Sequence, residues 1–273
     1  METQSVYLIL GHYSVIGSDD DMDIMSKTAS ELKHNAIVYT YPCGVVDIIH
    51  STSGFMEAGW ESREEKELPE KRLREKGKVA EGADLQKSMR RARAKLRRLA
   101  LANEFKWFVT LTLDPAKIDR EDGKAVAKAL SIWADNMVRR KGLKYILVPE
   151  LHKKGGIHFH GFFNDAVCVA ESGHYDGAGH PVFNLPEWTL GFTTAIELYG
   201  DYASAVGYVT KYIGKQGVRP MGRWYYSGGR LAEPTKTYAD LDRATLVLEN
   251  CGKAVEFSIP GAKLTVIHTK MEV

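Results

Sequence analysis

The stretch Gly155-Gly156-Ile157-His158-Phe159-His160-Gly161 places two histidines two residues apart in an apolar run that follows a glycine pair. In an extended strand, side chains two positions apart point to the same face. His158 and His160 therefore share one face of a predicted strand, and Phe159 takes the other. Two imidazoles held side by side form half of a metal site. The rest of the chain decides whether a further ligand faces them.

The chain has 273 residues, of which 44% are hydrophobic, and a formal net charge of +2. It is long enough to bury a core as one large or two modest domains, and its composition argues against wholesale disorder. The near-neutral charge confines any nucleic-acid affinity to local patches. Three widely separated cysteines without zinc-ligand spacing favour a reducing compartment. Since the longest apolar run near the start, 6–10, is too short for a signal peptide or membrane span, we expect a soluble cytoplasmic protein.

Composition divides the chain into four segments, with boundaries at 1–56, 57–100, 101–230 and 231–273. The first is interpreted as an accessory N-terminal segment, with strand-like runs at 6–10, 37–41 and 45–49. The last is interpreted as a C-terminal extension, with a short helix around 238–250 and strands at 255–259 and 263–269. Neither end carries chemistry that we recognise.

The second segment, 57–100, is dense in mixed charge and ends in a basic predicted helix. Leu85, Met89, Ala92, Leu96 and Leu99 recur at helical spacing, with arginines and lysines on the remaining surface. Such a helix either docks by its apolar stripe with solvated charges, or also meets phosphate. The candidate DNA-binding residues here are Arg90, Arg91, Arg93 and Arg97. A second basic and aromatic stretch adds Arg223, Trp224 and Arg230, unless it is only a packed aromatic turn.

The third segment alternates predicted strands and helices. We expect strands at 107–113, 145–150, 157–163 and 192–196, and helices at 125–140 and 202–214. Gly142 is the predicted end of the first helix, and Asp201 the predicted cap of the second. Turn residues between 150 and 157 make the second and third strands an antiparallel hairpin. A polar stretch at 165–186 contains a smaller predicted hairpin.

The main hairpin brings a carboxylate to the histidine pair. Glu150 ends one strand, and His158 and His160 lie on its partner. Side chains opposed across an antiparallel pair lie roughly 5 Å apart, so Glu150 can complete a Glu-His-His cluster. Oxygen and imidazole ligands with open positions suit a divalent ion such as Mg²⁺ or Mn²⁺.

A second constellation lies in the later predicted helix, at Tyr208, Lys211, Tyr212 and Lys215. These residues fall at helical positions that share one face, where a buried core would not alternate tyrosine with lysine. The face is either solvated or functional. As a functional site it provides a tyrosine nucleophile, with lysines and a metal-polarised phosphate to activate a phenol whose ordinary pKa is near 10. A tyrosine oxygen would attack phosphorus, leaving a 3′-hydroxyl and a 5′-phosphotyrosine link that a later hydroxyl can reverse.

Three ordered motifs resemble those of the HUH endonucleases, the rolling-circle replication initiators of phages, plasmids and small circular viruses. They are 108–112, 157–161 and 208–212, and the resemblance covers roughly residues 86 to 230. The resemblance implies an α+β fold with a five-stranded antiparallel sheet flanked by helices. It further implies that metal and tyrosine face each other across a groove for single-stranded DNA. Glu150 matches the family's third metal ligand, and the strand with Thr110 and Thr112 is structural in that family.

The tyrosine motif fits two kinds of initiator. Single-tyrosine members carry Tyr-x-x-Lys-x-Gly, as in 212–217, and two-tyrosine members carry Tyr-x-x-Lys-Tyr, as in 208–212. We favour Tyr212 as the essential nucleophile with Tyr208 as its partner. Because the chain lacks a Gly-x-x-x-x-Gly-Lys-Ser/Thr motif, unwinding would need a separate helicase, and synthesis the host polymerase.

Three other functions stay open at this point. A relaxase or single-strand transposase would share the chemistry but serve transfer or transposition. A non-enzymatic single-strand binder would bind DNA without nicking it and would be indifferent to loss of both tyrosine hydroxyls. A cupin-like metal enzyme also uses His-x-His, but it requires a glutamate soon after the pair, where this chain offers only Asp165.

Overall fold

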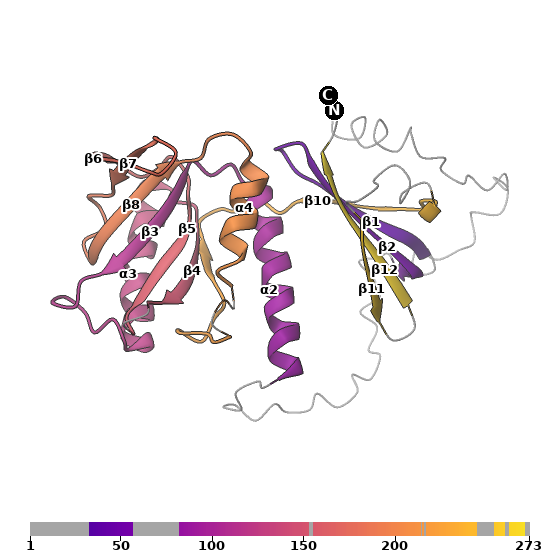
Figure 1. Cartoon of the computed structure of the whole chain (residues 1–273), viewed down its shortest axis with the longest axis horizontal. Helices are drawn as coiled ribbons and strands as arrows, with labels where there is room; N and C mark the ends of the chain where they lie inside the picture. Colours follow the sequence, from indigo (N-terminus) through magenta and orange to yellow (C-terminus); the bar gives the residue numbers. More distant parts are fainter. Residues whose placement is uncertain are drawn as a thin grey trace. The chain divides into compact units, whose positions relative to one another are not determined.

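A computed structural model describes residues 33–56, 82–152, 155–213, 215, 217–244, 254–259 and 262–270 of the chain (Figure 1). The chain divides into two compact units, one of residues 1–79 and 234–273 and the other of residues 80–233. Each unit is described by itself below. The runs expected at 6–10 and the charged stretch at 61–78 lie outside the described residues.

The unit of residues 80–233 is built on one antiparallel sheet with the strand order β6-β7-β8-β3-β5-β4-β9. Its strands are β3 (Trp107–Leu113), β4 (Tyr145–Leu151), β5 (Ile157–Phe163), β6 (Ala170–Tyr175), β7 (Pro181–Asn184), β8 (Gly191–Glu197) and β9 (Tyr226–Gly228). The predicted α+β class is confirmed, and the sheet has seven strands where five were expected. The difference arises at the edges, where the β6–β7 hairpin and the short β9 add to the four central strands.

One face of this sheet is the main hydrophobic core. Along β3 the odd positions, from Trp107 to Leu113, are buried, and they pack with Leu147, Phe159 and the helix α3 (Gly123–Lys141). The helix begins where it does because the Asp122 carboxylate accepts hydrogen bonds from the first backbone amides. It ends at Gly142, as predicted, with φ of 71°, a left-handed conformation that glycine adopts without strain.

The opposite face is covered in part by α2 (Ala83–Leu101) and α4 (Tyr202–Thr210), which contact each other (Figure 1). The Tyr202 hydroxyl donates to the backbone oxygens of Ala100 and Asn103 at 2.8 Å each, joining the two helices. Asp201 stands at the start of α4 as predicted, but its carboxylate accepts from the Ser204 hydroxyl and caps no backbone amide. Polar residues at even strand positions lie on this second face, beyond α4.

Gly161, the last residue of the opening motif, has a packing role. A Cβ added there would lie 1.9 Å from the backbone oxygen of Ile146 on β4. We expect Gly161→Ala to lower the free energy of unfolding by at least about 3 kcal/mol, because the backbone of a central strand must move to admit the methyl group. Gly177→Ala, where a Cβ meets nothing within 4 Å, should change it by less than about 0.5 kcal/mol. Urea denaturation of both variants measures the difference, and equal midpoints would contradict the packing argument.

The unit of residues 1–79 and 234–273 contains a five-stranded antiparallel sheet with the order β10-β1-β2-β12-β11. Its strands are β1 (Lys33–Thr40), β2 (Val45–Met56), β10 (Thr235–Ala239), β11 (Ala254–Ile259) and β12 (Ala262–Lys270). The strands from the two ends of the chain pair with each other, β1 with β10 and β2 with β12. The expected helix around 238–250 is wrong at its start, because Tyr238 and Ala239 are strand residues in register with β1, and 245–250 lie outside the described residues.

Candidate metal and tyrosine site

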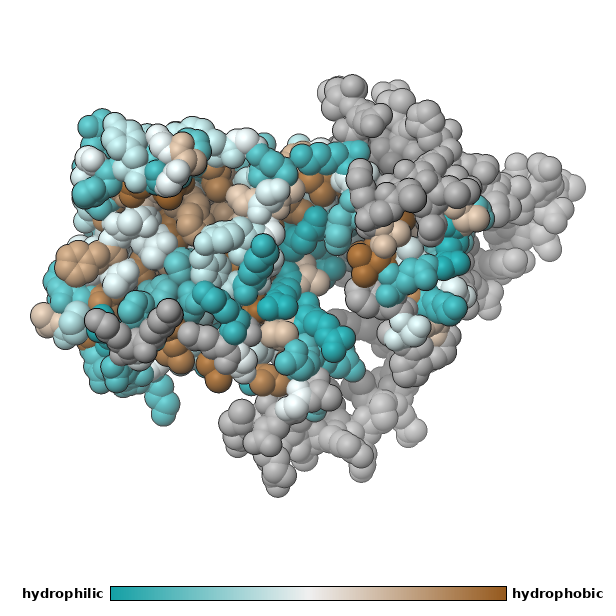
Figure 2. Space-filling view, viewed as in Figure 1, coloured by the Kyte–Doolittle hydropathy of each residue, from teal (hydrophilic) through white to brown (hydrophobic). Residues whose placement is uncertain are grey.

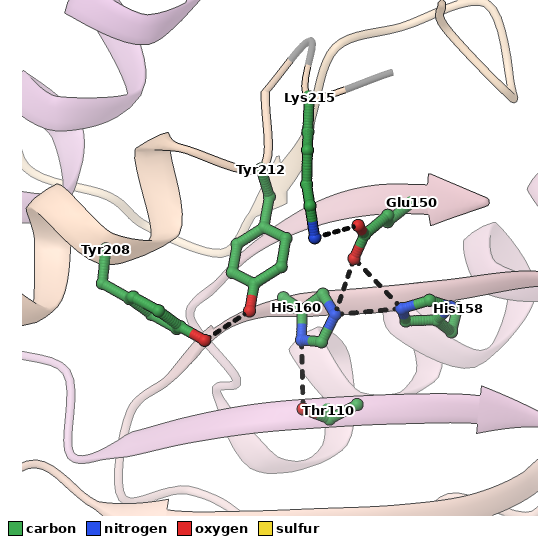
Figure 3. A network of polar contacts seen from close by, with 7 residues as sticks. All are labelled: Thr110, Glu150, His158, His160, Tyr208, Tyr212 and Lys215. Atoms are coloured by element: carbon green, nitrogen blue, oxygen red, sulfur yellow. Dashed lines mark hydrogen bonds and ion pairs between the residues drawn. The ribbon is translucent and has the colours of Figure 1, made fainter. Parts of the chain in front are cut away.

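The β4–β5 hairpin brings one carboxylate and two imidazoles together (Figure 3). Glu150 lies directly opposite His158 in the strand register. Glu150 Oε2 is 3.2 Å from His158 Nε2 and 3.1 Å from His160 Nε2, and the two Nε2 atoms are 3.0 Å apart. The three residues form a possible metal-binding triad, and its potential ligand atoms all lie within 4.8 Å of one another.

The spacing of these three atoms fits a divalent ion. An ion with octahedral coordination at about 2.1 Å holds neighbouring ligand atoms about 3 Å apart. Imidazole must be neutral to bind a metal. Burial lowers the pKa of His158, and it lowers the pKa of His160 to about 4 with the help of His158, so both rings are neutral at pH 7. His158 Nδ1 is buried and has no partner among the described residues, which further disfavours a second proton on that ring.

Thr110 was not expected to contribute to the site. Its Oγ1 lies 3.1 Å from His160 Nδ1, and β3 places the two residues opposite each other. We assign the proton to Nδ1, donated to the hydroxyl, because this leaves the Nε2 lone pair facing Glu150 and His158. The signal for Thr110 was present in the sequence. It is a polar residue at an even position of a strand whose odd positions are apolar.

Glu150 has a further partner in Lys215. Its second oxygen, Oε1, lies 2.8 Å from Lys215 Nζ. Burial alone would raise the pKa of Glu150, but the lysine ammonium and the two imidazoles lower it below its ordinary value. The carboxylate is therefore ionised at neutral pH, with one oxygen facing each group. Of the two lysines predicted for the site, Lys215 makes this contact, and Lys211 is exposed.

The tyrosines approach the triad from the chain that follows the sheet (Figure 3). The Tyr212 ring stacks on the His160 ring with centroids 4.1 Å apart. The Tyr212 hydroxyl donates to the Tyr208 hydroxyl at 2.6 Å. Tyr208 is half exposed, and its ring meets Phe108 at 5.9 Å. Burial, and then the contact with Tyr208, raises the pKa of Tyr212 above its ordinary value, so the phenol keeps its proton in the free protein.

The helix that carries the tyrosines is shorter than expected. α4 ends at Thr210, and the following turns are closed by bonds to the third residue back, from Tyr212 N to Val209 O and from Lys215 N to Tyr212 O. Residues three apart eclipse in such tight turns. Lys215 Nζ accordingly lies 5.2 Å from the centroid of the Tyr212 ring, and both residues face Glu150.

The basic residues predicted for DNA binding take several positions. Arg90 and Arg91 are exposed on α2, whose surface is hydrophilic in Figure 2. Arg97 is half-buried, and Arg223 and Arg230 are exposed. Arg93 differs, because its Nε and Nη2 both donate to the Ile213 backbone oxygen, at 3.0 and 2.6 Å.

Trp224 is the clear correction among them. Its side chain is buried, and its Nε1 donates to the Ser88 hydroxyl on α2 at 3.0 Å. The buried ring offers no free face to a DNA base, so the interpretation of this stretch as a packed aromatic turn holds at Trp224. The sequence alone did not distinguish the two, since a tryptophan among arginines and tyrosines suits either.

The region that contains the site matches one family model. Residues 106–217 match the family of replication-associated proteins of the ORF2 type. The matched region runs from the start of β3 to the turn that holds Tyr212 and Lys215, so it includes the triad and both tyrosines. This family match supports a replication initiator protein. No curated protein and no solved structure matches the chain. None of the described helices is long and apolar enough to cross a membrane.

Proposed function

We propose that this protein initiates replication by nicking and rejoining single-stranded origin DNA through a 5′-phosphotyrosine intermediate, as an endonuclease of the HUH kind. The observation that carries the proposal is the stack of Tyr212 on His160, which puts a phenol beside the triad of Glu150, His158 and His160. A nucleophile and a cation site on separate elements, facing each other, are what a phosphoryl transfer to tyrosine needs.

The reaction that this arrangement supports is an exchange of phosphorus–oxygen bonds. The Tyr212 oxygen forms a bond to the scissile phosphorus, the bond to the 3′ oxygen breaks, and that oxygen takes up a proton to leave as a hydroxyl. A divalent ion such as Mg²⁺ or Mn²⁺, held by the triad, would supply positive charge to the phosphate oxygens as negative charge builds up on them. Attack by a later 3′-hydroxyl on the phosphotyrosine reverses the exchange and rejoins the strand.

The surrounding residues have separate roles. Tyr208 accepts the hydroxyl hydrogen of Tyr212, so it lies first on the path by which the phenol proton leaves. Lys215 is close to both Glu150 and the Tyr212 ring, and its charge favours the phenolate over the neutral phenol. Tyr208 is also exposed enough to act as a second nucleophile once Tyr212 holds a strand. The exposed Lys211, together with Arg90, Arg91, Arg223 and Arg230, is proposed to contact phosphates.

Among functions with the same chemistry, the match to replication-associated proteins favours replication over conjugative transfer or transposition. A separate helicase and the host polymerase are the partners that this role requires. A cupin-like site is disfavoured, because the residue that joins the histidine pair is Glu150 from the preceding strand, whereas Asp165 is exposed and outside the triad.

A nicking assay tests the proposal. Protein, Mn²⁺ and a 5′-labelled or 3′-labelled pool of single-stranded oligonucleotides are mixed and then denatured. We expect the 3′-labelled fragments to migrate with the protein, and the 5′-labelled fragments to end in a hydroxyl that a polymerase extends. Both products should disappear when EDTA is added first. Binding of the pool without any denaturant-resistant species at any Mn²⁺ concentration would instead identify a non-enzymatic binder.

Arg93 provides a prediction about positioning. Since its guanidinium holds the Ile213 oxygen next to Tyr212, Arg93→Ala should slow adduct formation at saturating DNA by about tenfold to a hundredfold, with Arg93→Lys recovering part of the rate. The matched control is Arg90→Ala on the same helix. A lost phosphate contact there should weaken DNA binding and reduce its salt slope by about one, without changing the rate at saturation. Identical behaviour of the two variants would refute the separate role of Arg93.

A further inference from the structure

The triad belongs to a row of residues that crosses four strands of the sheet. Glu150 on β4 is opposite His158 on β5, His158 is opposite Thr112 on β3, and Thr112 is opposite Phe192 on β8. Directly opposed residues in antiparallel strands share a face. The four side chains therefore lie on the face of the sheet that carries the site. Ala195 on β8 belongs to the core on the other face, which agrees with this alternation.

The neighbouring rows on this face are progressively covered. In the next row, Tyr212 stacks on His160. In the row after that, Phe162 is fully buried, and Tyr202 and Tyr208 of α4 meet Phe162 and Phe108. The β8 end of the open side is different. Phe192 is 69% exposed, Thr194 is exposed, and the Phe192 ring contacts no other ring in the part of the chain that the structure describes.

We propose that Phe192 is a stacking platform for a base of the single-stranded DNA, close to the scissile phosphate. This inference rests on the proposed function and extends it from the reacting phosphate to the path of the strand. Neighbouring strands lie about 4.8 Å apart, so two steps of the row put Phe192 about 10 Å from His158. An aromatic ring stacks on a base of any sequence, and the open strip of β8 with Thr112 and Thr194 leaves room for the strand beside it.

Exposure of one apolar residue is not unusual by itself, so the location has to be tested against a matched residue. Ile132 provides that match, because it is 56% exposed on α3, the helix that covers the opposite face of the sheet. If exposed apolar area alone mattered, both residues would contribute equally to DNA binding. If the row across the sheet is the DNA path, only Phe192 contributes.

The experiment uses the full chain and a fluorescein-labelled oligonucleotide selected from a randomised single-stranded pool. We expect Phe192→Ala to raise the Kd about tenfold, while Phe192→Trp and Ile132→Ala stay within about twofold of the wild type. A scan of abasic sites along the same oligonucleotide should find one position near the cleavage point that also costs the wild type about tenfold. That abasic site should cost Phe192→Ala nothing further, because the stacking partner is already absent.

The outcomes separate this inference from the nickase proposal. Adduct formation by the wild type, combined with unchanged binding by Phe192→Ala, overturns the stacking role alone. Additive losses from the abasic site and Phe192→Ala overturn it as well. A binding loss confined to Phe192→Ala and the one abasic site, without any adduct in Mn²⁺, supports the stacking role and removes the nickase. Equal losses in Phe192→Ala and Ile132→Ala would mean that the surface binds DNA without a defined path.

Discussion

His158→Ala is expected to remove the response of the protein to Mn²⁺ and to lower adduct formation by at least about a hundredfold. Three ligand atoms meet in the wild type, and the variant keeps only the Glu150 oxygen and the His160 nitrogen. A ligand that binds only the folded state stabilises it by about 2.7 kcal/mol at a hundredfold excess over its Kd. Thermal unfolding with and without Mn²⁺ therefore measures ion binding independently of activity.

His158 is the informative member of the triad for this test. His160→Ala would also remove the ring on which Tyr212 stacks, and Glu150→Ala would leave Lys215 without its carboxylate. His174→Ala is the control, because His174 is exposed on β6 and undergoes the same chemical change away from the triad. Mn²⁺ should stabilise this control as it does the wild type. Equal stabilisation of His158→Ala by Mn²⁺ would show that the ion binds elsewhere.

The hairpin and its triad were predictable because strand geometry is local. The alternation of side chains in 157–163 assigns His158 and His160 to one face, and a short turn leaves Glu150 only one partner strand. The same alternation contained Thr110 and Phe192, which were overlooked. Their roles depend on which strands become neighbours of β5, and the order β8-β3-β5-β4 comes from long-range pairing that no local pattern states.

The helical parts were harder to predict where tertiary contacts replace local ones. The pattern of Tyr208, Lys211, Tyr212 and Lys215 suits a continuous helix, but the chain tightens after Thr210, and Arg93 of α2 takes the Ile213 oxygen. A tighter turn brings Lys215, rather than Lys211, to Glu150. Arg93 looked like its exposed neighbours in sequence, and only the contact between α2 and the turn after α4 distinguishes it.

Tyr212→Phe is expected to lower the yield of covalent protein–DNA adduct by at least about a thousandfold, the second large effect. Phenylalanine lacks the attacking oxygen but keeps the ring that stacks on His160. Mn²⁺ binding and DNA affinity should consequently stay within about twofold of the wild type, so the loss appears in the rate and not in binding. Tyr208→Phe should slow adduct formation by only about tenfold, since it removes one hydrogen-bond acceptor from Tyr212.

Denaturing gels with labelled oligonucleotide measure these rates, and Tyr199→Phe is the control because Tyr199 is as exposed as Tyr208 but contacts His180 instead. Abolition by Tyr208→Phe with survival in Tyr212→Phe would assign the nucleophile to Tyr208 and make Tyr212 the relay. An adduct that persists in the double variant would exclude both tyrosines. The sharper expectation is for Tyr212, because it stacks on a triad histidine and has Lys215 beside its ring, whereas Tyr208 is half exposed and reaches the triad only through Tyr212 and Phe108.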